Sequence, residues 1–338
     1  AAVQAFHPDS KMVALSDGRC IGYGVLIVCP GIKLDWDAIP GLTDTLGRNG
    51  VTSNYRYDLA PYTDRLSREF SGGRALFTQP AMPIKCAGAP QKAMYLSCHR
   101  WEKAALLGRS EVQFHAAGAV LFGVPAYVPA LMDYVDRYGI DLNFGSTLVE
   151  VDGPARTAIF EQAGGEGVKR VTQRFDMIHV VPPQLAPDFI RASPLAATSG
   201  FVEVDETSLR HTRYPDIFAL GDACSTSNAK TAAAARKQAP VVAVNALAAL
   251  DGAPPVAAYD GYGSCPLTVE AGKIVLAEFG YGGRLLPSFP NWLIEGTRPS
   301  RLSWLLKQSI LPQVYWRGMP KGREWMAKPQ PIDAPARP

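Results

Sequence analysis

The 338-residue sequence lacks several patterns that would assign it quickly to a class. It has no run of about eighteen uncharged apolar residues, which predicts no membrane-spanning helix. Its first ten residues lack the basic start and apolar stretch of a signal peptide. The net charge is only +3, which gives no general case for nucleic-acid binding. An apolar content of 47% still suffices for a full core, so we expect two domains and a tail.

Cysteine is scarce, and its spacing excludes two further classes. The chain has no CxxC pair and no Cys/His ligand spacing, so we expect no metal site. So few cysteines in a chain of this size do not make a secreted disulfide framework, and any disulfide is then catalytic rather than structural. The six positions are Cys20, Cys29, Cys86, Cys98, Cys224 and Cys265.

Apolar runs and helical repeats alternate along the chain, which predicts a doubly wound α/β fold. Strands are expected around residues 23–31, 74–78, 112–116, 140–144, 177–183 and 217–222, with helices around 57–70, 90–107, 125–137 and 230–250. An N-terminal hairpin over residues 3–15 and three short strands around 147–151, 155–161 and 169–175 complete the pattern.

Two of the cysteines stand where a predicted strand breaks into a loop before a helix, which is where α/β proteins place their chemistry. They are Cys86 and Cys224, 138 positions apart. Lys85, Lys92 and the helix start at Pro90 all favour a thiolate at Cys86. The alternative is that both cysteines are small buried hydrophobic residues.

The strand ending at Gly221 and Asp222, followed by a helix that begins near Lys230 and Thr231, matches the second flavin fingerprint of two-dinucleotide-domain flavoproteins. Gly221 allows a close backbone approach, Asp222 can accept hydrogen bonds from sugar hydroxyls, and the helix start can stabilise negative charge on the flavin. An ordinary strand–loop–helix unit with a capping aspartate is the alternative.

Pro30 and Gly31 end the strand that precedes the other flavin-contacting turn of the same proteins. In relatives that use NAD(P)H, the strand at 74–78 would lead into GxGxxG, yet here it leads into Pro80 and Cys86. The next strand ends near His115 with no carboxylate for a ribose. We therefore expect a cysteine-bearing loop in place of the nicotinamide pocket.

Segments 77–92 and 221–234 together resemble sulfide:quinone oxidoreductase, in its mitochondrial-like branch. The resemblance continues through 122–124, 179–183, 213–215 and 259–267 and covers essentially the whole chain. It implies an α/β, Rossmann-like flavoprotein with two dinucleotide-binding domains and FAD as cofactor. The family's first βαβ unit, with its GxGxxG, would precede Ala1, so the resemblance implies an N-terminally truncated chain.

The implied domains are residues 1–70 as part of the FAD-binding domain and 71–180 as the second Rossmann-like domain with the Cys86 loop. Residues 181–290 return to the FAD-binding domain with Cys224, and 291–338 form an amphipathic tail that associates with a membrane. One departure from some relatives is Ala223, which separates Gly221-Asp222 from Cys224.

The resemblance also implies a mechanism, in which hydrosulfide attacks a redox-active disulfide and leaves a persulfide on one cysteine. We assign the persulfide to Cys224 and the attack on the flavin to Cys86, with electrons passing to ubiquinone or menaquinone. The sulfane sulfur would pass to sulfite, glutathione, cyanide or sulfide. The implied catalytic residues are Cys86, Cys224, Lys92 and Asp44, the last standing where the family usually has a proton-transferring glutamate. The implied cofactor-binding residues are Pro30, Gly31, Pro80, Gly221, Asp222, Lys230 and Thr231.

Charge is concentrated in the tail, where residues 297–328 hold seven basic residues against one acidic residue. The tail is therefore about +6 and the rest about −3. Leucine and aromatic residues interleave with the basic ones, which suits a helix lying in a lipid headgroup layer. The alternative is a pair of amphipathic helices that cap the core. With the resemblance, the tail predicts monotopic attachment to the bacterial inner membrane or, in a eukaryote, the mitochondrial inner membrane.

Two other functions remain open at this point. One is a type II NADH:quinone oxidoreductase, which the missing nucleotide cradle disfavours. The other is a catalytically inactive fragment that acts only as a peripheral membrane protein. The sequence leaves the oligomeric state open, and a homodimer is compatible with it.

Overall fold

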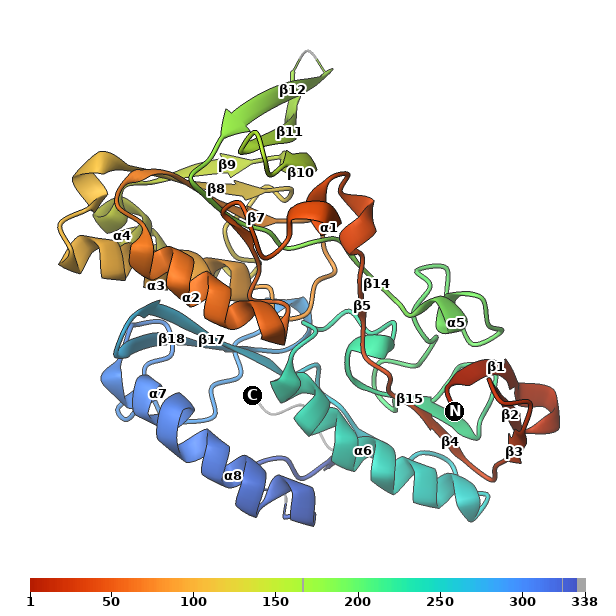
Figure 1. The fold of residues 1–338 in the computed structure, drawn as a ribbon. Helices are drawn as coiled ribbons and strands as arrows, with labels where there is room; N and C mark the ends of the chain where they lie inside the picture. The colour runs from red at the N-terminus through yellow and green to blue at the C-terminus, as the bar shows by residue number, and fades with distance from the viewer. Residues whose placement is uncertain (166, 324, 333–338) are drawn as a thin grey trace.

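The computed structural model describes residues 1–165, 167–323 and 325–332. Its largest sheet has five parallel strands in the order β6-β13-β7-β8-β9 (Figure 1). The strands are β6 (Val51–Thr52), β13 (Met177–His179), β7 (Gly73–Gln79), β8 (Ser110–Ala116) and β9 (Ile140–Phe144). The β7 residues Ala75, Leu76 and Phe77 are fully buried, as expected for a parallel sheet covered on both faces.

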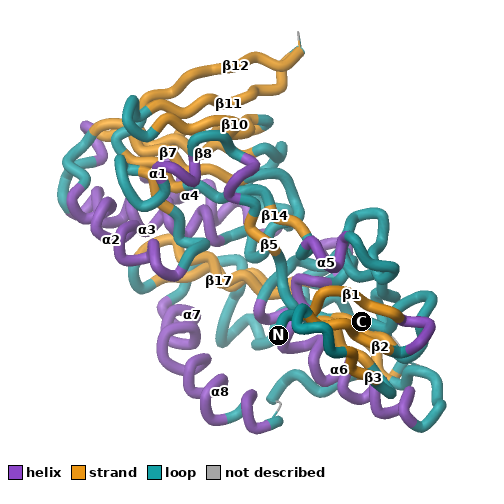
Figure 2. Tube along the Cα trace, turned by 45° about the vertical axis from the view of Figure 1, so that its right-hand side comes forward, coloured by secondary structure: helices purple, strands orange, loops and turns teal. Residues whose placement is uncertain are grey.

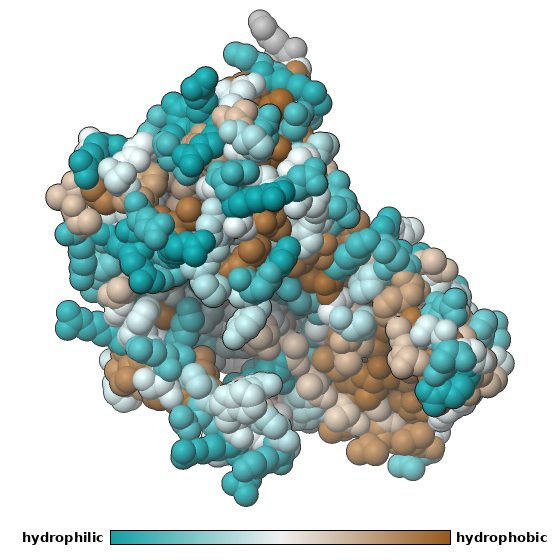
Figure 3. Space-filling model, in the orientation of Figure 1, coloured by the Kyte–Doolittle hydropathy of each residue, from teal (hydrophilic) through white to brown (hydrophobic). Residues whose placement is uncertain are grey.

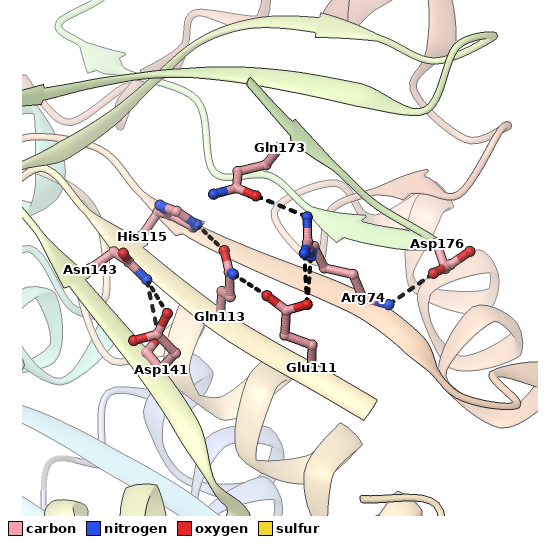
Figure 4. Close-up of polar contacts among 8 residues, drawn as sticks. All are labelled: Arg74, Glu111, Gln113, His115, Asp141, Asn143, Gln173 and Asp176. Atoms are coloured by element: carbon pink, nitrogen blue, oxygen red, sulfur yellow. Dashed lines mark hydrogen bonds and ion pairs between the residues drawn. The ribbon is translucent and has the colours of Figure 1, made fainter. Parts of the chain in front are cut away.

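One face of this sheet is covered by an antiparallel three-stranded sheet, β10 (Ser146–Asp152), β11 (Thr157–Gly164) and β12 (Gly167–Arg174). A chain of polar side chains lies between the two sheets (Figure 4). Arg74 binds Glu111 and Gln173, Gln113 donates to Glu111, and His115 contacts Gln113 and Ser146. These contacts give partners to the buried side chains of Gln113, His115 and Ser146.

Three helices cover the opposite face, α2 (Ala60–Glu69), α3 (Ala89–Lys103) and α4 (Val128–Tyr138). Helix α3 packs on the sheet with one side and on a second hairpin with the other. That hairpin consists of β17 (Gly263–Glu270) and β18 (Lys273–Phe279). Because α3 is covered on both sides, Met94, Tyr95 and Trp101 have no exposed surface. The successive layers are seen in Figure 2, with β10–β12 above β7–β8 and β17 below α3.

A separate part of the fold is built on a two-stranded parallel sheet, β4 (Leu26–Val28) and β15 (Ile217–Ala219). Beside it lie the small antiparallel sheet β1 (Val3–His7), β2 (Met12–Leu15) and β3 (Cys20–Gly22), and the long helix α6 (Ala232–Leu250). Figure 3 shows apolar surface over β4 and α6. We call Ile27, Val244, Leu247 and Leu250 the β4–α6 patch, since their side chains are substantially exposed.

The C-terminal segment forms α7 (Arg301–Leu305), a π-helical turn (Leu306–Ile310) and α8 (Leu311–Arg317). We call these three elements the tail helix. Its start is fixed by a β-bridge between Ser300 and Ile274 of β18. Among the described residues, no helix is both long enough and apolar enough to cross a membrane.

The elements follow the sequence prediction with a few shifts in extent. The strand expected around residues 23–31 is ordered as a strand only over Leu26–Val28, because the parallel pairing with β15 spans three residues. The helix expected over 57–70 begins as a 3-10 turn (Tyr57–Leu59) before α2. Strand β6 comes from the first 70 residues, which we expected in the FAD-binding domain, yet it pairs with β13.

Candidate functional site

The loop between β7 and α3 holds Cys86 in an unusual backbone conformation. Its φ is 79°, in the left-handed region that non-glycine residues rarely occupy. Two other segments hold the loop, because the Tyr55 hydroxyl donates to the carbonyl of Lys85 and the Gln184 side-chain oxygen accepts from the Lys85 amide. A strained residue held by its surroundings is typical of an active site.

The thiol of Cys86 lies beside the thiol of Cys265 on β17 in the same apolar cluster, and each affects the pKa of the other. Gly88 makes this contact possible. A β-carbon at Gly88 would lie 2.5 Å from the Cys265 Sγ and 2.2 Å from a Leu267 methyl carbon. The loop can therefore approach β17 only because this position is glycine, and the two sulfur atoms meet across the interface between α3 and the β17–β18 hairpin.

The surroundings of the two thiols favour one thiolate and one thiol. The hydrogen bond from Cys265 lowers the pKa of Cys86, burial opposes that effect, and the ammonium groups of Lys92 and Lys307 add to it. The Lys92 Nζ lies 3.8 Å from the Cys86 Sγ. The same hydrogen bond, together with burial, raises the pKa of Cys265 well above its ordinary value. Cys86 is therefore the thiolate and Cys265 the protonated partner.

The predicted partner Cys224 lies in a different part of the core. Its thiol donates to the Gly221 carbonyl at 3.1 Å and contacts the Thr226 hydroxyl at 3.0 Å. It belongs to the apolar cluster around β4 and β15, whereas Cys86 and Cys265 share the cluster around α3. The structure thus gives Cys86 a different thiol neighbour from the one that we predicted.

From the sequence, no partner could be assigned to Cys265, because it does not follow a strand end or precede a helix start as Cys86 and Cys224 do. In the structure Cys265 lies within β17 and is only 2% exposed. A usable signal was present, since segment 259–267 carries part of the family resemblance and contains this cysteine. Tyr55 and Gln184, which hold the Cys86 loop, gave no comparable signal.

Four of the predicted cofactor-binding residues, Pro30, Gly31, Gly221 and Asp222, lie at one edge of the β4–β15 sheet. The two strands are parallel, so Gly31 and Gly221 follow their carboxyl ends on the same side. Both glycines have a positive φ, 83° and 71°. Pro30 is exposed at this edge, and Pro80 follows the carboxyl end of β7.

Lys230 and Thr231 have structural partners in this region. The Lys230 ammonium donates to the carbonyls of Asp222 and Cys224, and it lies 4.1 Å from the centroid of the Phe201 ring. Thr231 caps α6 by accepting a hydrogen bond from the Ala234 amide. Both residues therefore fix the loop after Asp222 and the start of α6.

Several polar groups near these loops fit a flavin. Burial raises the pKa of Asp222, and hydrogen bonds from sugar hydroxyls would satisfy its carboxyl group. The side-chain nitrogen of Gln184 and the side-chain oxygen of Gln79 are buried without a hydrogen-bond partner among the described residues. Buried amides of this kind normally have partners, so the pattern fits a polar group bound between the Cys86 loop and the β15 edge.

Asp44 lies away from the Cys86 loop and the β4–β15 edge. It is exposed on α1 (Leu42–Thr45) and lines a surface cleft with Arg48, Glu150 and Asp152. None of the described residues around Cys86 lines that cleft. The structure does not bring Asp44 together with the thiols.

The fold and the site together define a two-dinucleotide-binding-domain flavoprotein. No protein-family model matches the chain. Individual proteins do match. The chain is 39% identical over 329 residues to the mitochondrial sulfide:quinone oxidoreductase of Dictyostelium discoideum, covering 97% of this chain and 71% of that protein. It is 34% identical over 320 residues to the mitochondrial sulfide:quinone oxidoreductase of Mus musculus, covering 95% of this chain and 70% of that protein.

Solved structures agree on the fold. The sulfide:quinone oxidoreductase of Aquifex aeolicus superposes with a TM-score of 0.71 at 15% identity, covering 93% of this chain and 73% of that one. A chain of the mitochondrial ATP synthase assembly of Tetrahymena thermophila superposes with a TM-score of 0.76 at 21% identity. The match covers 94% of this chain and 76% of that one. The chain belongs to the sulfide:quinone oxidoreductase family and is an oxidoreductase.

Proposed function

We propose that this chain oxidises sulfide at the Cys86–Cys265 pair and passes the electrons through FAD to a quinone. The observation that carries the proposal is the contact between these two thiols beside Lys92. The names of the related proteins supply the substrates, sulfide and quinone. Cys265 thereby takes the role that sequence reasoning gave to Cys224.

The proposed sulfur step starts from a disulfide between Cys86 and Cys265. Hydrosulfide attacks one sulfur, the disulfide bond breaks, and a new sulfur–sulfur bond forms to the incoming sulfur. One cysteine becomes a persulfide, and the other leaves as a thiolate that carries the negative charge of the hydrosulfide. The incoming sulfur is oxidised by two electrons, and the disulfide is reduced by the same two.

The electrostatics assign the two roles. The better leaving group in thiol–disulfide exchange is the sulfur with the lower pKa, which here is Cys86. Lys92 stabilises the thiolate as it leaves. We therefore assign the persulfide to Cys265, from which a nucleophilic acceptor such as sulfite, glutathione, cyanide or a second sulfide takes the outer sulfur.

FAD would be held by the glycine turns at Gly31 and Gly221, with Asp222 on its hydroxyl groups and the helix start at Thr231 beside it. Pro30 and Pro80 would shape the loops that enclose it. When bound, the flavin supplies the two-electron acceptor that restores the disulfide and reduces quinone. The protein's own task is to keep Cys86 ionised within reach of that acceptor.

The tail helix supports attachment to a membrane surface, where quinone is dissolved. Its exposed side chains include Leu302, Leu305, Ile310, Tyr315 and Trp316. Basic residues such as Arg301 and Arg317 lie on the same short segment. Apolar and aromatic side chains combined with basic ones favour binding in the headgroup layer. Since related proteins are described as mitochondrial, we propose the inner mitochondrial membrane or its bacterial counterpart.

The thiol pair can be tested on the purified chain. After mild oxidation, digestion and mass spectrometry, the peptide with Cys86 should be linked to the peptide with Cys265. In FAD-loaded protein, Cys86→Ser and Cys265→Ser should each slow sulfide-dependent flavin reduction about a hundredfold or more, because each removes one half of the disulfide.

The matched control is Cys98→Ser, which removes a buried thiol of α3 outside the pair and should leave flavin reduction unchanged. A Cys86–Cys224 crosslink would restore the pairing that the sequence suggested. Full activity of Cys265→Ser would overturn the proposed pair. Rapid bleaching by NADH with none by sulfide would favour an NADH:quinone oxidoreductase instead.

A further inference from the structure

A second, partly buried ammonium group lies near the thiol pair and comes from the C-terminal tail. The Lys307 Nζ donates to the Thr268 hydroxyl at 3.0 Å. Thr268 lies on β17, three positions after Cys265, and is 1% exposed. Lys307 therefore contacts the strand that carries one of the two cysteines.

The helix that carries Lys307 is built to direct it inward. Ser300 is bridged to Ile274 of β18 and caps α7 by accepting from the Ser303 amide. Ser303 is 1% exposed, and Lys307 follows one turn later on the same side. The regular α-helix gives way to a π-helical turn at Leu306–Ile310, which contains Lys307. Single π-turns of this kind often occur where a functional side chain must be aimed.

The position of Lys307 is electrostatically costly. Burial lowers its pKa to about 8, and the nearby Lys92 ammonium contributes to the same effect. The sulfur atoms of Cys265 and Cys86 act in the opposite direction and raise the pKa of Lys307. Two ammonium groups near each other in a partly buried site are unfavourable unless an anion lies close to both. The thiolate of Cys86 is the anion that the described residues provide.

We propose that Lys307 is a positioning residue of the thiol site, which stabilises the anionic sulfur of Cys86 and acts through it rather than on substrate directly. This inference rests on the proposed function. It joins the tail helix to the sulfur chemistry, because the thiolate then depends on a residue that is present only when the tail helix is seated on β17.

The groups that face the Cys86 thiol come from five elements. Lys92 belongs to α3, Cys265 to β17 and Lys307 to the π-helical turn, while Asp222 follows β15 and Tyr55 follows β6. Asp222 raises the pKa of Cys86, whereas the two lysines lower it. Burial and the neighbouring sulfur atoms raise the pKa of Tyr55, so its hydroxyl stays protonated and neutral.

The test measures how fast iodoacetamide alkylates Cys86 in the full chain as a function of pH. Mass spectrometry of the Cys86 peptide separates it from the exposed Cys20 and Cys29. In Lys307→Met the midpoint of the profile should rise by about half to one pH unit. On the acid side of the midpoint, the alkylation rate should fall about three- to tenfold, since only the thiolate reacts.

Lys307→Arg retains the positive charge and should keep the midpoint near its original value. Lys321→Met removes an exposed lysine from the same C-terminal segment and should leave the profile unchanged. The melting temperature of Lys307→Met should be equal to or above that of the unmodified chain, because a partly buried ammonium group is removed. A lower melting temperature with an unchanged midpoint would show a purely structural role and overturn the inference.

The same measurement separates this inference from the proposed function. If the unmodified chain already titrates at the ordinary thiol value of about 8.5, then no thiolate site exists and the proposed function loses its basis. If the unmodified midpoint is low and Lys307→Met does not move it, the Lys307 inference fails while the thiol pair stands.

Discussion

At the scale of single residues, the site depends on Cys86 occupying a backbone conformation that suits glycine better. The φ of 79° places its β-carbon close to backbone atoms, at a cost of the order of 1 kcal/mol or more. Tyr55 and Gln184 maintain this conformation from outside the loop. The loop conformation thus places the Cys86 sulfur atom and lowers the stability of the folded chain.

This strain predicts the order of stability of two variants that both lack the thiol. Cys86→Gly should be more stable than Cys86→Ala by about 1 kcal/mol, because glycine adopts a positive φ without strain. Urea unfolding of the two variants measures the difference. At the neighbouring Ala87, which is not among the residues with positive φ, a change to glycine should lower stability instead. Equal stability of Cys86→Gly and Cys86→Ala would contradict the strain argument.

At the scale of elements, β8 contributes a buried histidine to the polar chain between the two sheets. His115 is 1% exposed and stacks on Phe160 with ring centroids 3.9 Å apart. The Gln113 amide donates to Glu111, so its oxygen is left to accept from the His115 Nε2. The Nδ1 then accepts from Ser146, which describes a neutral ring.

This neutral histidine predicts a loss of stability in mild acid. Burial lowers the pKa of His115 to about 4, from an ordinary value of 6.5. Between these values the unfolded chain binds a proton that the folded chain does not, so the free energy of unfolding falls as the pH drops from about 6.5 to 4. The full loss is about 3 kcal/mol.

Urea unfolding at pH 7 and pH 5 should show a smaller acid loss for His115→Gln than for the unmodified chain. The control is His7→Gln, which changes an exposed histidine and should leave the acid loss unchanged. Identical pH dependence of His115→Gln and the unmodified chain would mean that His115 is not buried in its neutral form.

The elements also show how far sequence reasoning reaches. The β7–α3 loop and the glycine turns after β4 and β15 were located from local patterns, because strand ends and glycines are local signals. The proximity of Cys86 and Cys265 could not be located in this way, because it depends on how the β17–β18 hairpin packs against α3. Lys230 looked like a cofactor ligand, and only the folded loop shows that its ammonium binds two carbonyl groups.

At the scale of the whole molecule, two of the surfaces on which the described residues expose apolar side chains bear on membrane binding. One is the tail helix with Trp316 at 70% exposure, and the other is the β4–α6 patch with Leu247 at 63%. Large exposed apolar surfaces usually mark sites of interaction. The tail helix combines its apolar side chains with basic residues, so we expect it to be the surface that meets lipid.

This expectation can be checked by flotation with vesicles that contain anionic phospholipid. A Leu305→Ser/Trp316→Ser variant should bind at least about tenfold more weakly, because each lost side chain removes more than 1 kcal/mol of apolar burial. A Leu247→Ser/Leu250→Ser variant of the β4–α6 patch serves as the matched control and should bind as well as the unmodified chain. Weaker binding of the patch variant alone would place the membrane contact on β4 and α6.

The thiol pair joins two places that are far apart in the order of synthesis. Cys86 and Cys265 are separated by 179 positions in the chain. At about 5 to 20 residues per second, a ribosome adds that length in roughly 10 to 40 s. During this interval the Cys86 loop exists without the hairpin that supplies its partner sulfur. A cell that makes this protein therefore has to keep a reactive thiol from pairing with other cysteines until the β17–β18 hairpin has emerged.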